Sequence, residues 1–284
     1  MNGILNINKP KGISSNAVLT KIKKRFNIKK IGHLGTLDPM AEGVLPITIG
    51  KATRLFDLFL KKDKTYFATF TFGIETDTLD SEGKITKQNS ALVKKEEIEK
   101  VLQEFTGNIM QVPPKFSAKN VNGKRAYQLA RNEEEFTLSP KEVTIYNIEL
   151  KEEIEKNTFT FFIHCSSGTY IRSIVRDIAN KLNTVGYMSA LTRLSSGNFK
   201  LESSVNLNTL LENDINDYFI PLEKVLKDYK KVELAEECYF DLLNGKKIPF
   251  NKEENDFLLY CKNELFGIAT SNDGYIKIKT YLKS

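Results

Sequence analysis

Three runs rich in β-branched and aromatic residues constrain the fold of this chain most strongly. They are TYFATFTFGI (65–74), EVTIYNIEL (142–150) and TFTFFIHCSS (158–167). Residues of these types fit a pleated, half-buried surface, so each run predicts a strand. GILNIN (3–8), which alternates apolar and polar residues at period two, and GVLPITIG (43–50) predict two more. A sheet is therefore expected to organise much of the chain.

Helical patterns lie between these strands. Ser14 or Ser15 can cap a helix through AVLTKIKKRF (17–26). Further helices are predicted over 52–60, 96–105, 125–131 and 171–182. Because strands and helices alternate without a strict βαβ order, the predicted fold is mixed α+β, with a largely antiparallel sheet flanked by helices.

At 284 residues the chain exceeds one domain of ordinary size. A Pro-broken helical segment passes into short β-like runs near residue 230. We therefore expect one large domain over 1–230 and a small β module over 231–284.

Composition predicts a folded protein outside the membrane. No apolar run approaches the roughly 20 residues that span a bilayer, and MNGILNINKPKG lacks the apolar stretch of a signal peptide, so a cytoplasmic location is expected. Cys165, Cys238 and Cys261 are far apart in the sequence. This spacing favours buried thiols over a disulfide framework or a zinc site.

Positive charge is concentrated near the N-terminus. Residues 1–64 contain 13 Lys or Arg against 4 Asp or Glu, whereas the whole chain has a net charge of +6. Part of this excess is KIKKRFNIKK (21–30), which is either a solvated helix face or a surface that binds a polyanion such as RNA.

A single carboxylate stands out in GHLGTLDPMAEGVLP (32–46). Asp38 precedes a proline, which disfavours helix, and Gly32 and Gly35 permit a tight backbone path. This loop can present Asp38 at a fixed point, although an isolated LDP is also a common turn, whose carboxylate binds nearby N–H groups.

Metal chemistry fits this loop poorly, because only His33 and Glu42 lie near Asp38 as possible ligands. ETDTLDSEG (75–83) also fails as a calcium loop, since Asn89 falls where a bidentate Glu is required. One ionised Asp can still act as a nucleophile or by its charge, if a cation stabilises it. Arg172, just inside the predicted helix after CSSGTY, is a candidate.

Several motifs occur in an order that resembles one family. They are NINKPKGISS, GHLGTLDPMAEGVLPITIGKATRL, DKTYFATFTFGIETDTLDSEG, VPPKFSAKNVNGKRAYQLAR, CSSGTYIRSIVRDIA and LTRLSSGNF. Together they look like the bacterial TruB family, the tRNA pseudouridine-55 synthases, over roughly residues 3–225. The resemblance implies the pseudouridine synthase fold and isomerisation of uridine 55 in the T-arm of tRNA. It also implies that no metal, cofactor or obligatory protein partner is needed, and a monomer is expected.

The resemblance assigns residues to this activity. Asp38 matches the catalytic aspartate, which attacks either the ribose or the base. Arg172 matches the arginine that pairs with it, and Tyr66 matches the tyrosine that stacks on the target base and can assist proton removal at C5. His33 matches the histidine that holds the extruded RNA loop, and Asp80 matches a substrate contact near the active site.

Further RNA contacts are expected from cations in the matching motifs, where ordinary surface solvation is the alternative. These are Lys115, Lys119, Lys124 and Arg125, together with Lys9 and Lys51, for which a structural role is the other candidate. Family members usually end in a PUA domain that binds the acceptor end of tRNA. Residues 231–284 are short for one and predict a diverged PUA-like module.

Two other functions are compatible with these motifs. A protein of the same fold could bind or fold RNA without catalysis, although binding alone requires no nucleophile. A metal-free hydrolase could use Asp38 as a covalent nucleophile, with Glu42 activating water.

Overall fold

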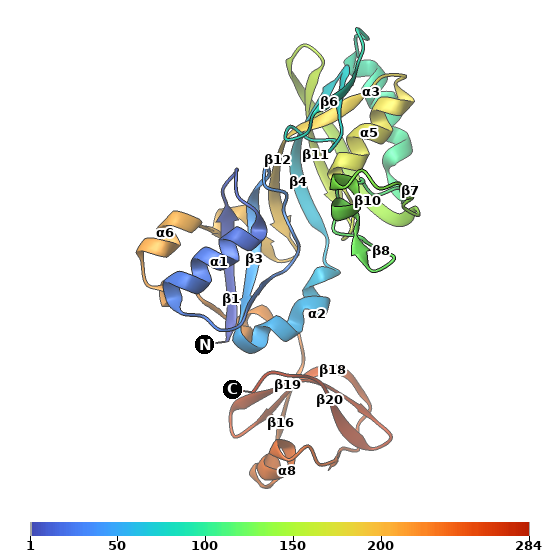
Figure 1. The fold of residues 1–284 in the computed structure, drawn as a ribbon. Helices are drawn as coiled ribbons and strands as arrows, with labels where there is room; N and C mark the ends of the chain where they lie inside the picture. Colours follow the sequence, from blue (N-terminus) through green and yellow to red (C-terminus); the bar gives the residue numbers. More distant parts are fainter. Residues whose placement is uncertain (1, 284) are drawn as a thin grey trace.

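The computed structural model describes residues 2–283, which form a large sheet flanked by helices and a smaller C-terminal sheet (Figure 1). The large sheet has eleven strands, in the order β14-β1-β3-β12-β4-β11-β10-β7, and β13, β15 and β2 pair with it off this path. Its pairs are antiparallel except β1 with β14 and β3 with β12. The predicted α+β fold with a largely antiparallel sheet is confirmed.

The strands of the large sheet have the following bounds: β1 Gly3–Lys9, β2 Ile31–His33, β3 Glu42–Ile49, β4 Lys64–Phe72, β7 Gly107–Gln111, β10 Lys141–Glu155, β11 Thr158–Cys165, β12 Gly186–Ser196, β13 Phe199–Lys200, β14 Val205–Asn206 and β15 Ile220–Pro221. Two separate hairpins are formed by β5 (Ile74–Thr76) with β6 (Ile85–Gln88), and by β8 (Asn120–Val121) with β9 (Lys124–Arg125). The helices are α1 Ser15–Phe26, α2 Phe56–Leu60, α3 Lys95–Leu102, α4 Ala126–Arg131, α5 Ile171–Lys181, α6 Leu207–Glu212, α7 Leu222–Val225 and α8 Tyr239–Leu243.

The three β-prone runs lie side by side as β4, β11 and β10, and the rings of Phe70 and Phe161 pack with their centroids 4.6 Å apart. The strand predicted over 65–74 ends at Phe72. Gly73 follows with a φ of 90°, a left-handed conformation that breaks the strand before β5 begins.

Helix α1 follows from its sequence. The Ser14 side chain accepts a hydrogen bond from the N–H of Ala17, and Asn27 ends the helix in the left-handed conformation. Val18 and Ile22 are completely buried against the sheet. The basic residues of the last turn complement the helix dipole, so the cationic end of α1 is locally favourable.

The helix predicted over 52–60 is divided in two. A 3-10 helix, η1 (Gly50–Leu55), precedes α2. No helix among the described residues is long and apolar enough to cross a membrane.

The C-terminal sheet has five strands in the order β16-β18-β19-β20-β17, namely Lys231–Leu234, Glu254–Cys261, Glu264–Asn272, Tyr275–Tyr281 and Ile248–Pro249. Leu258 and Ile268 of this sheet share a buried cluster with Leu55 and Phe59. The C-terminal sheet is therefore packed against the segment that contains η1 and α2, below the large sheet in Figure 1.

Gly43 marks the closest approach between β3 and β12. Its φ is 104°, and a Cβ atom there would lie 2.3 Å from the carbonyl oxygen of Arg193. We expect Gly43→Ala to lower the free energy of unfolding by about 2 kcal/mol or more, measured by urea denaturation, because backbone strain and a clash with backbone add. Gly245→Ala is the control, since Gly245 also has a positive φ but a Cβ atom added there would meet nothing within 4 Å. Equal losses for both variants would contradict the packing argument.

Candidate active site

Asp38 lies in the loop between β2 and β3. The N–H of Ala41 donates to the carbonyl oxygen of Asp38 at 3.1 Å and closes a turn around Pro39. The carboxylate is about one third exposed, so it can meet a substrate from one side.

The first residue of α1 and the turn before it hold both neighbours of Asp38. The buried hydroxyl of Ser15 donates to the carbonyl oxygen of Leu37 and accepts from its N–H, both at 2.9 Å. The N–H of Gly12 donates to the carbonyl oxygen of Pro39 at 2.9 Å. These bonds fix the backbone on each side of the carboxylate, which limits how far Asp38 can move.

A buried arginine binds the backbone of the Asp38 loop and of β3. The Arg193 side chain on β12 donates to the carbonyl oxygens of Gly35 at 3.1 Å, Thr36 at 3.3 Å and Val44 at 2.7 Å. The sequence-based assignment missed Arg193, although LTRLSSGNF belongs to the matching motifs. Its signal is the period-two pattern, which puts Arg193 on the same buried face as Leu191.

Arg172, near the start of α5, binds the Asp38 carboxylate with two donors. Its Nε lies 2.9 Å from Oδ2 of Asp38, and its Nη2 donates to Oδ1 at 3.0 Å. Such paired bonds fix the orientation of a carboxylate as well as its charge. The remaining donors bind the carbonyl oxygens of Thr78 and Phe116.

Asp80 binds the same guanidinium, with Oδ2 3.3 Å from Nη1 of Arg172. Its other oxygen accepts from the Thr78 hydroxyl at 2.6 Å and from the N–H of Glu82 at 3.1 Å. The preceding Leu79 has a φ of 61°, a strained conformation for a residue with a side chain. Asp80 is almost completely buried, so it holds Arg172 rather than reaching into solvent.

The start of α5 is fixed by a side chain that the sequence-based assignment also missed. The Gln111 amide accepts from the N–H of Tyr170 at 2.8 Å and donates to its carbonyl oxygen at 3.1 Å. Two residues further on is Arg172, so Gln111 sets the direction from which the guanidinium enters.

Asp38 and Asp80 share one cation, Arg172, so two negative charges lie close to a single positive one. Burial raises the pKa of Asp38 above 3.8, and the negative charge of Asp80 adds to this effect, whereas Arg172 opposes it. Glu82 lies at the surface beside this pair, and its partial loss of hydration, together with the charges of Asp80 and Asp38, raises its pKa.

This arrangement predicts a shift in pH dependence for Asp80→Asn. Removing the negative charge of Asp80 lowers the pKa of Asp38, so Asp38 becomes ionised at lower pH. We therefore expect the acid limb of the pH–rate profile of product formation to move to lower pH, while the maximal rate falls by about 10²-fold because Arg172 loses a support. Glu82→Gln is the control and should shift the limb less. A limb that moves to higher pH would contradict this account.

Arg193 also acts electrostatically on Tyr66 and His33. Tyr66 on β4 is 7% exposed, and burial raises the pKa of its hydroxyl to about 12, with Arg193 opposing. Burial and the charge of Arg193 lower the pKa of His33, so its imidazole is neutral near pH 7. The Nδ1 atom of His33 is buried without a hydrogen-bond partner among the described residues.

The structure corrects one of the predicted RNA contacts. Lys9 is completely buried, and its ammonium group donates to the carbonyl oxygens of Pro10, Ile13 and Pro39. Burial also lowers the pKa of Lys9 to about 8. Its donors are used inside the protein, so it supports the Asp38 loop instead of contacting RNA.

Lys51 also makes a structural contact. Its ammonium donates to the carbonyl oxygen of Lys283 at 2.6 Å and lies over the ring of Tyr281. It therefore connects η1 to the C-terminal sheet, and contact of its other donors with RNA stays a prediction.

The other predicted RNA contacts lie between β7 and the end of α4. Lys115 is exposed and Lys119 is half-buried. Lys124 forms an ion pair with Glu134, and Arg125 donates to the carbonyl oxygen of Ala118. Because the carbonyl oxygen of Phe116 binds Arg172, this segment borders the Asp38 site. Contact with RNA stays a prediction for these four residues.

Glu42, the residue that a hydrolase would need, lies on β3 and accepts from the Thr192 hydroxyl at 3.2 Å. Within residues 2–283, no three His, Cys, Asp or Glu side chains are grouped as ligands of one metal ion.

Comparisons with known proteins show which family the chain resembles. Residues 23–171 match the family model described as TruB family pseudouridylate synthase (N terminal domain). The chain is 41% identical over 278 residues to tRNA pseudouridine synthase B of Clostridium kluyveri, covering 98% of this chain and 95% of that protein. It is 42% identical over 289 residues to the protein of the same name from Clostridium novyi, covering 99% and 100%.

A solved structure, described as a Cbf5-Nop10-Gar1 complex, contains a chain with the same fold. The TM-score is 0.72 at 26% identity, and the match covers 99% of this chain and 84% of that one. On the family match and the relatives, this chain belongs to the TruB family of pseudouridylate synthases.

Proposed function

We propose that this chain converts uridine 55 in the T-arm of tRNA to pseudouridine, with Asp38 as the catalytic residue. The observation that carries the proposal is the two-donor pair between Asp38 and Arg172, in a loop held on both sides by Ser15 and Gly12. The names of the relatives, tRNA pseudouridine synthase B, support the reaction and the substrate. The cytoplasmic location, the monomeric state and the independence of metal and cofactor are parts of this proposal.

The reaction rearranges bonds within one nucleotide. Asp38 attacks either the ribose or the base, and the N1–C1′ bond breaks. The base then rotates, C5 bonds to C1′, and the bond to Asp38 breaks, which restores the carboxylate. The proton of C5 is lost and N1 gains a proton, so atoms balance without water as a reactant.

Arg172 has the task of keeping Asp38 ionised although burial opposes this. In the proposed complex the ionised carboxylate of Asp38 forms a bond to the substrate. Because two donors fix its orientation, less entropy is lost in reaching the reactive geometry. Asp80 in turn holds the guanidinium, and it acts on the reaction through Arg172.

The target base must leave its stack before its glycosidic bond can be attacked, at a cost of a few kcal/mol. Stacking on an aromatic ring returns roughly 1–3 kcal/mol per base, which is the role proposed for Tyr66. Because the pKa of its hydroxyl is about 12, Tyr66 stays protonated near pH 7. This favours stacking of its ring on the base over a role for its phenolate in the reaction. Neutral His33 is assigned to holding the opened RNA loop.

The test uses an unmodified T-arm stem-loop with tritium at C5 of its uridines, without added metal or cofactor. Isomerisation replaces the C5 hydrogen, so we expect tritium release that stops when the target uridine is replaced by cytidine. Binding of the stem-loop and of full-length tRNA without release from either would favour the non-catalytic RNA-binding protein. Release of free uracil would favour the hydrolase.

A further inference from the structure

A pocket of about 510 Å³ lies away from the Asp38 site, at the end of α1 and beside η1. Its volume falls within the range of roughly 300–1,000 Å³ of sites that bind small molecules or single groups. Phe26, Ile28 and Ile49 supply apolar lining. Phe26 and Ile28 are half-buried and Ile49 is buried, so the pocket offers an apolar surface of defined shape.

The charged residues that line this pocket are all cations. They are Lys29, Lys30, Lys51 and Arg54, and no carboxylate lines it. Lys29 and Lys30 are exposed and form no ion pair with a described residue. Lys51 and Arg54 each bind a carbonyl oxygen near the C-terminus, and each has further donors.

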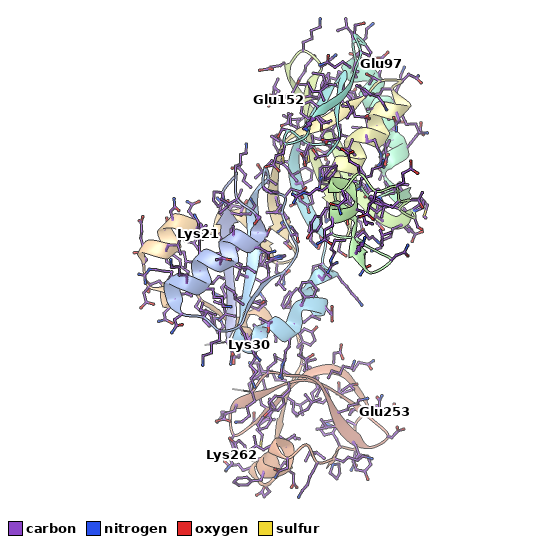
Figure 2. The ribbon with its side chains drawn as sticks, viewed as in Figure 1. Lys21, Lys30, Glu97, Glu152, Glu253 and Lys262 are labelled. Atoms are coloured by element: carbon purple, nitrogen blue, oxygen red, sulfur yellow. The ribbon has the colours of Figure 1, made fainter. Side chains whose placement is uncertain are left out.

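The pocket is too far from Asp38 to hold the target nucleotide. Lys9, at one end of β1, binds the carbonyl oxygen of Pro39, whereas Asn2, just before the other end, lines the pocket. Seven residues of strand rise about 3.3 Å each, a separation on the order of 20 Å. Figure 2 labels Lys30, between α1 and β2, at the edge of the large domain that faces the C-terminal sheet.

We propose that this pocket binds a nucleotide of tRNA outside the T-arm, with the base against the apolar wall and the phosphate at Lys29 and Lys30. An apolar wall with a rim of one sign fits a base joined to a phosphate, since the base buries apolar surface while the cations neutralise the phosphate. This inference rests on the proposed function, because it takes tRNA as the substrate. It makes the end of α1 a second RNA contact, which positions the whole tRNA while the T-loop is at Asp38.

The first test compares Lys29→Glu/Lys30→Glu with Lys100→Glu/Lys156→Glu. Lys100 and Lys156 are exposed and make no ion pair with a described residue, and neither lines the pocket, so the control carries the same change of charge. For the pocket variant we expect the Kd of full-length tRNA to rise about tenfold, and the Kd of the T-arm stem-loop to stay within twofold. The slope of log K against log salt should fall by about one per lysine that contacts phosphate.

The second test places one charge inside the pocket without removing a lysine. Thr53 lines the pocket, and Thr53→Glu and Thr53→Gln differ in charge but hardly in size. Only Thr53→Glu should weaken full-length tRNA, because its carboxylate repels the phosphate. This pair keeps the inference testable if the double lysine variant unfolds.

Three outcomes would overturn the inference. They are unchanged affinity for full-length tRNA in both pocket variants, equal losses for the tRNA and the stem-loop, and binding of a free nucleoside monophosphate that the pocket variants abolish while tRNA affinity is unchanged. Tritium release by the unaltered protein is measured in parallel. If that release is absent, the proposed function fails, and the binding comparison still reports on the pocket.

Discussion

Asp38→Asn is expected to lower the rate of tritium release from the T-arm stem-loop by about 10⁴-fold or more. The amide has almost the same shape, and its oxygen can still accept a hydrogen bond from Arg172, but it is neutral and a very poor nucleophile. Losses of about 10⁴–10⁶ are seen when the acting group of a catalytic unit is removed. Single-turnover assays with saturating enzyme separate this loss from any change in binding.

Binding supplies the control for Asp38→Asn. The affinity for tRNA should change by less than about tenfold, because the RNA surface keeps its cations. Glu42→Gln is a matched loss of a nearby carboxylate and should keep most of the activity, since Glu42 bonds to Thr192 and not to Arg172. Unchanged conversion by Asp38→Asn would rule out the mechanism, and an equal loss in Glu42→Gln would favour the hydrolase.

Arg172→Ala should affect both stability and pH dependence. It leaves Asp38 and the buried Asp80 without the cation that they share. Removing one partner of a buried ion pair costs about 3–5 kcal/mol, which urea denaturation would measure. Because the Arg172 charge lowers the pKa of Asp38, its loss raises that pKa, so the acid limb of the pH–rate profile should move to higher pH.

Two variants are expected to shift the acid limb of the pH–rate profile in opposite directions. Asp80→Asn should move the acid limb to lower pH and Arg172→Ala to higher pH, whereas general damage to the site would move neither in a defined direction. Arg172→Lys keeps the charge but cannot donate from a planar group to both carboxylates, so it should recover part of the stability and less of the rate. A fully stable Arg172→Ala protein would contradict the shared-cation arrangement.

Local patterns were sufficient to predict most helices and strands. The aromatic runs form β4, β10 and β11. Helix α1 begins after Ser14, as predicted, because the Ser14 side chain accepts a hydrogen bond from the N–H of Ala17 in the first turn. The end of β4 at Phe72 was missed because it depends on the conformation of Gly73. The predicted boundary near residue 230 stays a prediction.

Local sequence patterns predicted the contacts of the candidate active site less well than the helices and strands. The pairing of Asp38 with Arg172, 134 residues away, came from resemblance and not from spacing. Lys9 was a candidate for a structural role or an RNA contact, and the structure supports the structural role, because three carbonyl oxygens receive its donors inside the fold. The period-two pattern puts Arg193 on a buried face, but Arg193 and Gln111 bind backbone groups distant in sequence, and no local pattern specifies those partners.

The supports of the Asp38 loop come from distant parts of the chain, including Ser15, Arg172 and Arg193. Closing such long loops costs entropy before the contacts form, and folds rich in them generally form slowly. No short segment can therefore assemble the catalytic geometry by itself. Activity should return during refolding only as the whole sheet forms. The rate at which turnover recovers can therefore measure the rate of the last stage of folding.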